Sequence, residues 1–462
     1  MNKEIYTVIG LGKTGLSCVE FLLGKNLDVF ACDTRKNPPN IDAARKLLSD
    51  EKISLGIIDN EILDRSNVIV LSPGVSRAEP FIVDQIKKGK PVIGDVELFC
   101  RLVKAPIVAI TGTNGKSTVT AMVGEMARQA GVDVKVGGNI GTPVLELLSK
   151  AEPELYVLEL SSFQLESTES LSAEVAVILN LTPDHLDQHG SFESYKKAKF
   201  RVYENCKSVV INVDDEGTWP HSRHLGLNSS ETRMKLIRGL PEIENAKIKT
   251  YSAKKQADFH FKKENKELFL CQNSLPILSA KELKIKGLHQ YANALAALSI
   301  GSLINLPINS MCEALKQFEG LPHRCQFVRE VNGVLWFNDS KATTVASTIA
   351  SVSSVANEIA GKIVLLAGGL GKQQDFSPLK EISKHLKAAI LFGEDKLLFQ
   401  DVFEGEADSF IVSDLEEAVK KASNIASSGD AVLLAPACAS FDMFKNFEHR
   451  GDCFVQIVGN LK

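Results

Sequence analysis

The sequence predicts an α/β protein of three domains, and two observations carry that prediction. Short apolar and β-branched runs alternate with helical stretches along most of the chain, which is the pattern of parallel sheets covered by helices. The 462 residues also exceed what one domain usually holds, since domains average roughly 150 residues. The composition, 44% hydrophobic and 24% charged, is ordinary for a globular protein with several cores.

Charge and cysteine content exclude several classes of function. The formal net charge of −4 gives no overall positive field to attract nucleic acid. No apolar run reaches the ~20 residues that span a bilayer, and the first residues lack the pattern of a signal peptide. The nine cysteines form no Cys-x-x-Cys pair and are expected to be reduced, mostly buried thiols. We therefore expect a cytoplasmic protein without membrane insertion and without a nucleic-acid partner.

The first domain, residues 1–94, is expected to bind a nucleotide. Strands are predicted at 6–9, 29–32, 68–71 and 91–93, with a helix through Leu22 after the first of them. The loop Gly10-Leu-Gly-Lys-Thr-Gly15 follows the first strand, and Asp33 ends the second, which fits a dinucleotide fingerprint. NAD is one candidate, but Arg35 beside Asp33 could instead meet another phosphate or a base.

The second domain, residues 95–320, begins a new series of strands. These are predicted at 107–110, 155–160, 175–180 and 209–213, and an Ala-rich helix is predicted at 291–304. Between about 218 and 285 the chain is polar and Lys-rich, which we interpret as an insertion or a smaller sheet. A hinge at 320–322 precedes the third domain, residues 321–462, with strands predicted at 334–337, 363–366, 389–392 and 432–434.

A phosphate-binding loop is predicted where the strand 107–110 meets the next helix. It reads Gly112-Thr113-Asn114-Gly115-Lys116-Ser117-Thr118, shorter than the usual Walker pattern. Its backbone N–H groups and the start of the helix would face the phosphates. Lys116 would neutralise the β- and γ-phosphates, and Ser117 would offer its hydroxyl to Mg²⁺. The alternative is an ordinary glycine turn with a surface lysine.

Two charged residues near this loop need partners. Glu159 ends an otherwise apolar strand, so its carboxylate requires a cation or a donor, and a magnesium shared with Ser117 would satisfy it. Lys199 lies on the apolar stripe of a helix that starts near Ser191, with Tyr195 on the same stripe. An inward lysine is costly unless it is paired or chemically altered, and the alternative is a lysine whose ammonium reaches water.

Polar turns also follow three strands of the third domain. They lie at 339–343, 368–372 and 436–440, and His323-Arg324 lies at the hinge. Because the carboxyl ends of parallel strands meet at one edge of a sheet, we expect these turns to converge and form a site.

Several motifs together resemble the Mur ligase family, and the resemblance extends over nearly the whole chain. They are Thr111–Thr118, Gly138-Asn139-Ile-Gly141, Glu159-Leu-Ser-Ser-Phe-Gln164, His289-x-x-x-Asn293, Leu321-Pro-His-Arg324, Asp339-Ser-Lys-Ala-Thr343 and, with Ser72-Pro-Gly74, the segment 441–447. The resemblance implies an ATP-dependent amide-bond ligase of peptidoglycan precursor synthesis. Its substrates would be UDP-N-acetylmuramoyl-L-alanine and D-glutamate, its cofactors ATP and two Mg²⁺ ions, and its state a monomer.

By this resemblance each group of residues has an expected role. The catalytic residues would be Lys116, Glu159, His185 and Lys199. The UDP substrate would be bound by Thr14, Asp33, Thr34, Arg35, Ser72, Gly74, Asn139 and His185. ATP would be bound by residues 112–118 with Asn293, Arg324 and Asp339. D-Glutamate would be held by Thr343, Lys372, Ser440 and Phe447. One Mg²⁺ would be bound by Ser117 and Glu159, and a second by His185 and a carbamylated Lys199, since a carbamate supplies the oxygen ligands that Mg²⁺ prefers.

Three other functions remain open at this point. A nucleotide-dependent switch protein would explain the phosphate loop but not the converging turns of the third domain. An NAD-dependent dehydrogenase would explain the first glycine loop and leave residues 112–117 without a role. Other members of the family remain possible, because the choice of amino acid depends on few residues.

Overall fold

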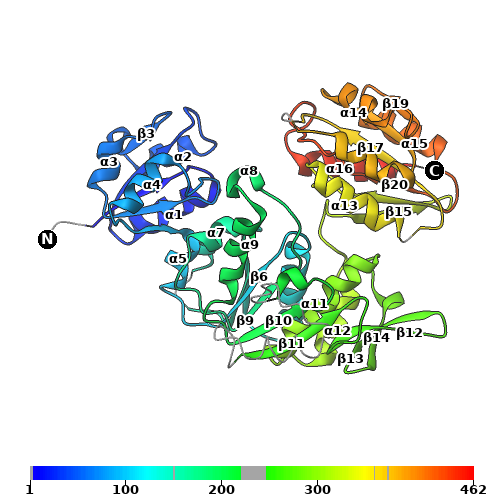
Figure 1. Ribbon diagram of the computed structural model, residues 1–462, viewed down its shortest axis with the longest axis horizontal. Coiled ribbons are helices and arrows are strands. Elements are labelled where there is room, and N and C mark those ends of the chain that lie inside the picture. The colour runs from blue at the N-terminus through cyan, green and yellow to red at the C-terminus, as the bar shows by residue number, and fades with distance from the viewer. Residues whose placement is uncertain (1–3, 149–150, 220–245, 358, 372–373, 462) are drawn as a thin grey trace. The chain divides into compact units, whose positions relative to one another are not determined.

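Three α/β sheets follow one another along the chain in the computed structural model (Figure 1). The structure describes residues 4–148, 151–219, 246–357, 359–371 and 374–461. These residues divide into two compact units, one of 1–280 with 293–316 and the other of 281–292 with 317–462. The α/β prediction is therefore confirmed. Within the described ranges, no helix is long and apolar enough to cross a membrane.

The first sheet has five parallel strands in the order β3-β2-β1-β4-β5. The strands are β1 (Ile5–Ile9), β2 (Asp28–Asp33), β3 (Ile53–Leu55), β4 (Val68–Leu71) and β5 (Val92–Gly94). The helices are α1 (Lys13–Gly24), α2 (Ile41–Leu47), α3 (Asn60–Arg65) and α4 (Pro80–Lys87), followed by α5 (Asp95–Cys100). The order reverses at β1, so the loops after β1 and β4 flank the crevice where such sheets bind ligands.

The second sheet has nine strands in the order β14-β13-β12-β11-β10-β9-β6-β8-β7. They are β6 (Ile107–Thr111), β7 (Val134–Gly138), β8 (Leu155–Glu159), β9 (Val175–Ile178), β10 (Ser208–Asn212), β11 (Lys247–Ser252), β12 (Phe259–Glu264), β13 (Glu267–Gln272) and β14 (Leu275–Ser279). The helices are α6 (Lys116–Gln129), α7 (Ser162–Glu166), α8 (Leu186–His189), α9 (Phe192–Phe200), α11 (Leu288–Leu303) and α12 (Ile308–Gln317).

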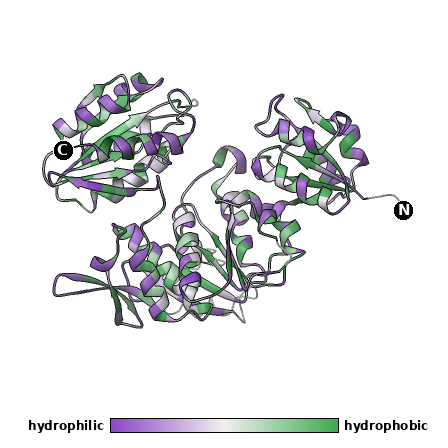
Figure 2. Ribbon diagram, turned by 180° about the vertical axis from the view of Figure 1, so that it is seen from behind, coloured by the Kyte–Doolittle hydropathy of each residue, from purple (hydrophilic) through white to green (hydrophobic). Residues whose placement is uncertain are grey.

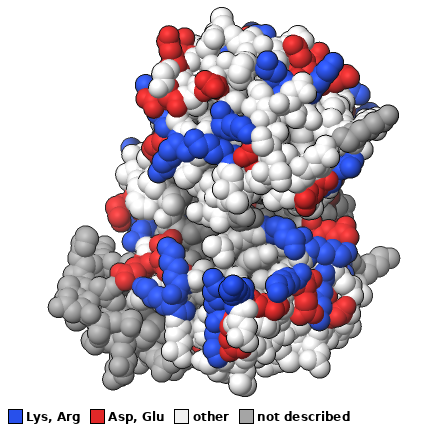
Figure 3. Space-filling view, turned by 90° about the vertical axis from the view of Figure 1, so that its right-hand side faces the viewer, with Lys and Arg blue, Asp and Glu red and all other residues white. Residues whose placement is uncertain are grey.

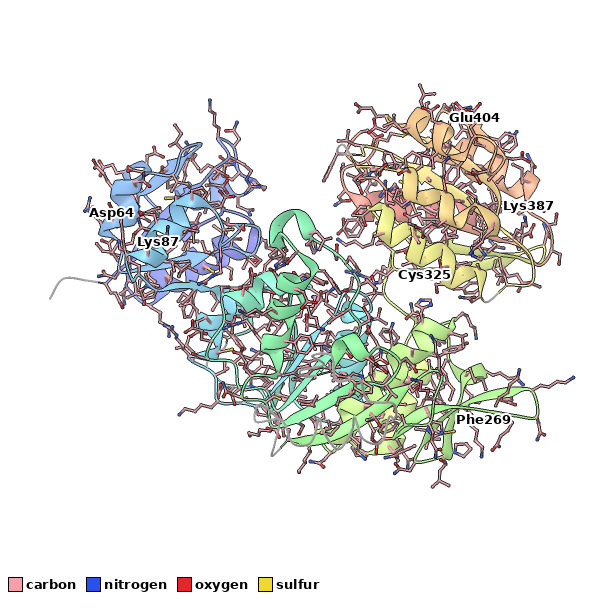
Figure 4. All side chains as sticks on the ribbon, viewed as in Figure 1. Asp64, Lys87, Phe269, Cys325, Lys387 and Glu404 are labelled. Carbon is pink, nitrogen blue, oxygen red and sulfur yellow. The ribbon has the colours of Figure 1, made fainter. Side chains whose placement is uncertain are left out.

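The Lys-rich segment extends this second sheet instead of forming a separate one. β11 pairs with β10 in parallel, and β12, β13 and β14 continue the sheet, the last two in antiparallel pairs. Phe269, labelled in Figure 4, lies on β13 in this extension. Residues 220–245, the first part of the predicted insertion, lie outside the described residues.

The third sheet has six strands in the order β15-β16-β20-β17-β18-β19. They are β15 (Gln326–Val331), β16 (Val334–Asn338), β17 (Ile363–Gly368), β18 (Leu386–Phe392), β19 (Ser409–Ile411) and β20 (Ala431–Leu434), and Lys387 at the start of β18 is labelled in Figure 4. The helices are α13 (Val345–Ala356), α14 (Lys396–Phe403), α15 (Leu415–Ile425) and α16 (Phe447–Gly459).

Successive apolar side chains on the central strands point to opposite faces of this sheet, which explains why helices cover both faces. On β17, Ile363 and Leu365 belong to one apolar cluster, whereas Val364 and Leu366 belong to another. Figure 2 shows hydrophobic strands between helices that have hydrophilic outer faces. A central parallel strand of this kind is buried from end to end, so polar side chains are expected only where the strand ends.

Surface charge and thiols agree with the sequence analysis. Figure 3 shows one face on which acidic and basic side chains are interspersed, without a broad field of one sign. All nine cysteines are free thiols, and six of them are buried. The prediction of mostly buried cysteines is confirmed.

Candidate functional site

The phosphate loop lies between β6 and α6, as the sequence predicts. Gly115 has a φ of 81°, a left-handed conformation that favours glycine, and it is the residue that caps α6. A Cβ atom at Gly115 would stand 2.5 Å from Asn293 Oδ1, so Asn293 lies directly beside the loop. Two of the predicted ATP-binding segments are thus brought together, and the open N–H groups of the first turn of α6 can receive an anion.

Glu159 finds the donors that its burial requires. Its side chain is 2% exposed. Ser117 Oγ donates to Glu159 Oε2 over 2.7 Å, and Asn139 Nδ2 donates to Glu159 Oε1 over 2.8 Å. One predicted metal pair, Ser117 with Glu159, is therefore in contact.

The oxygen atoms of Ser117 and Glu159 are chemically suitable ligands for Mg²⁺. A hydroxyl and a carboxylate oxygen are the hard ligands that Mg²⁺ takes, and it usually keeps waters and substrate phosphates for the rest of its octahedron. Across the described ranges, no group of three or more His, Cys, Asp or Glu side chains could hold a metal by itself. The residues therefore suit a metal that arrives with a nucleotide more than a permanent protein cage.

Lys199 points inward, which excludes the alternative of a lysine that reaches water. The residue is 2% exposed. Its Nζ donates to the carbonyl oxygen of Gly112 over 2.9 Å and to Thr111 Oγ1 over 3.3 Å, and it lies 4.7 Å from the centre of the Tyr195 ring. Burial, followed by the positive charge of Lys116, holds the pKa of Lys199 well below its ordinary value. A lysine of this kind gives up its proton readily.

Helix α8 and the loop before it bring His185 to a cavity that Lys199 also lines. His185 adopts a left-handed φ of 51° and caps α8, and its ring packs edge-on against Phe163 at 5.2 Å. The cavity has a volume of about 320 Å³ and is lined by Lys116, Asn139, His185 and Lys199, together with Pro73, Gly74, Ser161, Ser162, Phe163, Asp184, Gln188 and Tyr195. Of the four predicted catalytic residues, three line this cavity, and Glu159 bonds to Asn139, which also lines it.

A second cavity of about 540 Å³ lies over the first glycine loop. Its lining includes Thr14, Asp33, Arg35, Ser72, Gly74 and Asn139 from the predicted UDP-binding set. Thr34 is exposed and is not among the lining residues. Pro73, Gly74 and Asn139 line both cavities, so the two adjoin.

The glycine loop and Asp33 shape this second cavity. A Cβ atom on Gly15 would stand 1.7 Å from the carbonyl oxygen of Gly10, which explains why a glycine is needed where α1 packs against the strand. Asp33 accepts the N–H of Leu11 at 2.7 Å and both the backbone and the guanidinium of Arg35. Burial would raise the pKa of Asp33, but these hydrogen bonds outweigh it, and the pKa is lowered. The aspartate is a fixed anion that also orients Arg35.

The third sheet assembles the predicted turns at one edge. The backbone N–H of Ala437 donates to Ala342 over 2.9 Å, and Leu370 and Ala439 exchange two bonds of 3.0 Å, so the turns after β16, β17 and β20 contact one another. The predicted convergence is confirmed. Within the second compact unit these turns carry Thr343 and Ser440, and Lys372 lies outside the described residues.

Other predicted residues of this unit lie around the same edge. Asp339 is buried and accepts a hydrogen bond from Ser351 Oγ, and burial raises its pKa above the ordinary value. Lys341 Nζ lies 4.1 Å from the centre of the Phe447 ring. Arg324 lies in the hinge segment before β15, partly buried.

Some residues of the site were not assigned a role by the sequence analysis. Gln164 lines the larger cavity, and Tyr195 and Phe163 line the smaller one. The motif Glu159-Leu-Ser-Ser-Phe-Gln164 was a signal for two of them, because it follows a strand end. Tyr195 was placed only on the apolar stripe of α9, where a packing role and a role in the site look alike.

Comparisons with known proteins agree with this arrangement. Three family models match, one in each predicted domain: the Mur ligase MurD-like N-terminal domain at 4–94, the Mur ligase middle domain at 110–301 and the Mur ligase glutamate ligase domain at 323–438. These matches confirm the three-domain organisation, while the boundaries after residues 94 and 320 stay predictions.

Curated relatives match along the full length. A UDP-N-acetylmuramoylalanine–D-glutamate ligase of Nitrosococcus oceani is 43% identical over 98% of this chain and 96% of its own. Ligases of the same name from Coxiella burnetii (strain Dugway 5J108-111) and Pseudomonas syringae pv. tomato are 42% identical, covering 100% of both chains in the first case, and 98% of this chain and 97% of the relative in the second.

Solved structures share the fold at low identity. A pseudomurein peptide ligase type C from Methanothermus fervidus superposes with a TM-score of 0.59 at 19% identity over the whole of both chains. The UDP-N-acetylmuramate-alanine ligase MurC from Thermotoga maritima gives a TM-score of 0.58 at 19% identity, also over both whole chains. With the phosphate loop, the inward lysine and the full-length relatives taken together, this chain belongs to the Mur ligase family.

Proposed function

We propose that this protein joins D-glutamate to UDP-N-acetylmuramoyl-L-alanine in peptidoglycan precursor synthesis, with ATP as the source of energy. The observation that carries the proposal is that the two cavities adjoin at Gly74 and Asn139. A nucleotide-linked substrate seated over the first glycine loop would extend its far end toward Lys116 and Lys199. The activity named for the full-length relatives supports the same substrates.

The reaction needs an activated carboxylate, because a carboxylate is a poor electrophile in water. The carboxylate oxygen of the alanyl group attacks the γ-phosphorus of ATP, ADP leaves, and an acyl phosphate forms. The amine of D-glutamate then attacks the carbonyl carbon, loses a proton, and phosphate leaves as the amide bond forms. The protein contributes position and charge, as in other phosphoryl transfers.

Residues of the phosphate loop supply much of that charge. Lys116 Nζ donates to the carbonyl oxygens of Gly112 and Thr113 at 3.0 and 2.8 Å, so it is held within the loop that would cradle the phosphates. The donors Ser117 and Glu159 would hold one Mg²⁺, and His185 with a carbamylated Lys199 a second. When bound, Mg²⁺ offsets the negative charge of the transferring phosphoryl group.

Binding roles follow the two cavities and the third sheet. In this proposal Thr14, Asp33, Arg35 and Ser72 hold the UDP end, and Asn139 and His185 lie nearer the reacting carboxylate. Asn293 with Arg324 and Asp339 would contact the adenine nucleotide, and Thr343, Ser440 and Phe447 would hold D-glutamate. The nine free thiols suit the reducing cytoplasm, where we place the protein as a monomer.

The test is phosphate release from ATP and Mg²⁺ in the presence of UDP-N-acetylmuramoyl-L-alanine, with D-glutamate, L-glutamate or no amino acid. Release that depends on D-glutamate, together with a matching amide product, is the expected result. Release with a different amino acid would assign the chain to another reaction of the family. Release that ignores both substrates would favour a nucleotide-dependent switch.

A further inference from the structure

Gln374 connects the three turns of the third sheet through one side chain. Its Nε2 donates to the carbonyl oxygens of Gly371 at 3.0 Å, Ala437 at 3.3 Å and Thr343 at 3.5 Å. These acceptors belong to the turns after β17, β20 and β16 respectively. Its Oε1 accepts the backbone N–H of Val345 at 3.3 Å.

Only an amide side chain satisfies this arrangement. The –NH₂ group shares its two hydrogens among the three carbonyl acceptors, with Gly371 and Ala437 nearer than Thr343, and the amide oxygen is an acceptor for one N–H. Val345 is the first residue of α13, so its N–H has no partner within the helix. A glutamate at position 374 would present oxygen to three carbonyl oxygens, and a hydrophobic side chain would leave all four backbone groups without this partner.

The backbone around Gln374 is held from other directions too. Its own N–H donates to the Gly371 carbonyl at 3.1 Å, and the Gly371 N–H donates to Asp395 Oδ2 at 2.7 Å. The side chain therefore projects from a turn that other hydrogen bonds hold in place, and its own hydrogen bonds fix the two neighbouring turns relative to it. The turn after β16 continues into Thr343, and the turn after β20 continues from Ala437 to Ser440.

We infer that Gln374 is a positioning residue that fixes the turns carrying Thr343 and Ser440 in the geometry that receives the amino-acid substrate. This inference rests on the proposed function, because the substrate assigned to these turns is D-glutamate. It predicts a defect that is largest for one substrate: the residues of the first compact unit assigned to ATP and the UDP substrate use none of the hydrogen bonds of Gln374. Asp339, assigned to ATP on the turn after β16, is bonded by Ser351 and not by Gln374.

The experiment compares Gln374→Glu with Gln400→Glu in the full-length protein. Gln400 is an exposed residue of α14 in the same compact unit, so its variant makes the same chemical change without touching the turns. We expect Gln374→Glu to raise the KM for D-glutamate about tenfold, as losing one or two hydrogen bonds does. The KM values for ATP and for UDP-N-acetylmuramoyl-L-alanine, and kcat at saturating D-glutamate, should change less than about twofold.

A substrate-free measurement separates this inference from the proposed function. Amide hydrogen exchange of Val345 and Ala437 should accelerate in Gln374→Glu and stay unchanged in Gln400→Glu. If the wild type does not use D-glutamate, the proposed function fails, and the exchange rates still test whether Gln374 fixes the turns. An unchanged KM for D-glutamate, equal changes in all three KM values, or unchanged exchange at both amides would each overturn the inference.

Discussion

Asp95 is a buried acid whose ionisation should lower the stability of the first compact unit at neutral pH. It opens α5, is 1% exposed, and its Oδ2 accepts a hydrogen bond from Gln164 Nε2 at 3.1 Å. Burial is the largest influence and outweighs the hydrogen bonds from Gln164 and from backbone N–H groups, so the pKa rises from 3.8 to about 6. Gln164 lines the larger cavity, so Asp95 stands directly behind the candidate substrate site.

The sign of the effect follows from where the proton is held. Between pH 3.8 and about 6 the folded chain keeps a proton on Asp95 that the unfolded chain releases. Stability from this group is therefore greatest below that window and falls as pH rises through it. At 1.36 kcal/mol per pKa unit the whole window is worth about 3 kcal/mol, of which about 1.4 kcal/mol falls between about pH 5 and pH 8.

Replacing Asp95 with Asn removes the titration, so the variant should lack this share of the pH dependence. The chain has two tryptophans, and Trp219 is buried in the same apolar cluster as Val96, whereas Trp336 belongs to the third sheet. In a Trp336→Phe background, urea unfolding followed by fluorescence then reports the first compact unit alone. The Asp95→Asn advantage should grow by about 1.4 kcal/mol from about pH 5 to pH 8.

An exposed acid serves as the matched control for this experiment. Asp42 on α2 is exposed, and Asp42→Asn should show no such growth. If the difference between Asp95→Asn and the wild type stayed constant from about pH 5 to pH 8, the carboxyl would not titrate in this window, and the argument from burial would be refuted.

Three further changes test other parts of the first compact unit. Glu97 accepts hydrogen bonds from Ser170 Oγ and two backbone N–H groups, and these outweigh burial and lower its pKa from 4.5 to about 2. The stability that Glu97 contributes is present above pH 4.5 and lost as pH falls toward 2. Glu97→Gln should therefore lower the free energy of unfolding by about 3 kcal/mol at neutral pH, measured by urea unfolding in the same Trp336→Phe background. Lys116→Ala should abolish phosphate release and leave the calorimetric Kd for the UDP substrate within about threefold; loss of both would contradict separate sites. Lys199→Arg should lose activity by roughly tenfold or more and lack the ¹³C carbamate signal expected for wild type in labelled bicarbonate; a signal in both would place the carbamate elsewhere.

Long buried strands were predictable, and so were the positions of the candidate site residues at their ends. β6 and β8 read as apolar runs, and each stops at a polar segment of the candidate site, the loop from Gly112 in one case and Glu159 in the other. For the lysine on the apolar stripe of α9 the sequence left two alternatives, an inward side chain or an ammonium that reaches water, and the 2% exposure of Lys199 selects the first. In these places burial requires apolar residues on one side of the helix or on both sides of the strand. The sequence pattern therefore shows where each polar residue must lie.

Other strands and one residue were not predicted, because they are not fully buried and so leave no apolar pattern in the sequence. β3 and β19 are three-residue strands with no fully buried position, and β15 is a half-exposed edge. In the extension from β11 to β14, Lys247 and Lys249 alternate with Ile248 and Thr250 on β11, and such alternation does not tell an added edge from a separate sheet. Gln374 lies in a turn without periodicity, and its partners are backbone carbonyls that no sequence pattern displays.

One carbonyl group explains how the phosphate loop and Lys199 are coupled. Lys116 Nζ and Lys199 Nζ both donate to the oxygen of Gly112, at 3.0 and 2.9 Å. Two ammonium groups at one acceptor repel each other, and burial followed by this repulsion holds the pKa of Lys199 low. An uncharged amine can add CO₂, which would replace the repulsion with an attraction between a carbamate and Lys116. In that case Lys116→Met should raise the pKa of Lys199 and weaken carbamate formation, an effect that the ¹³C signal would report without any turnover.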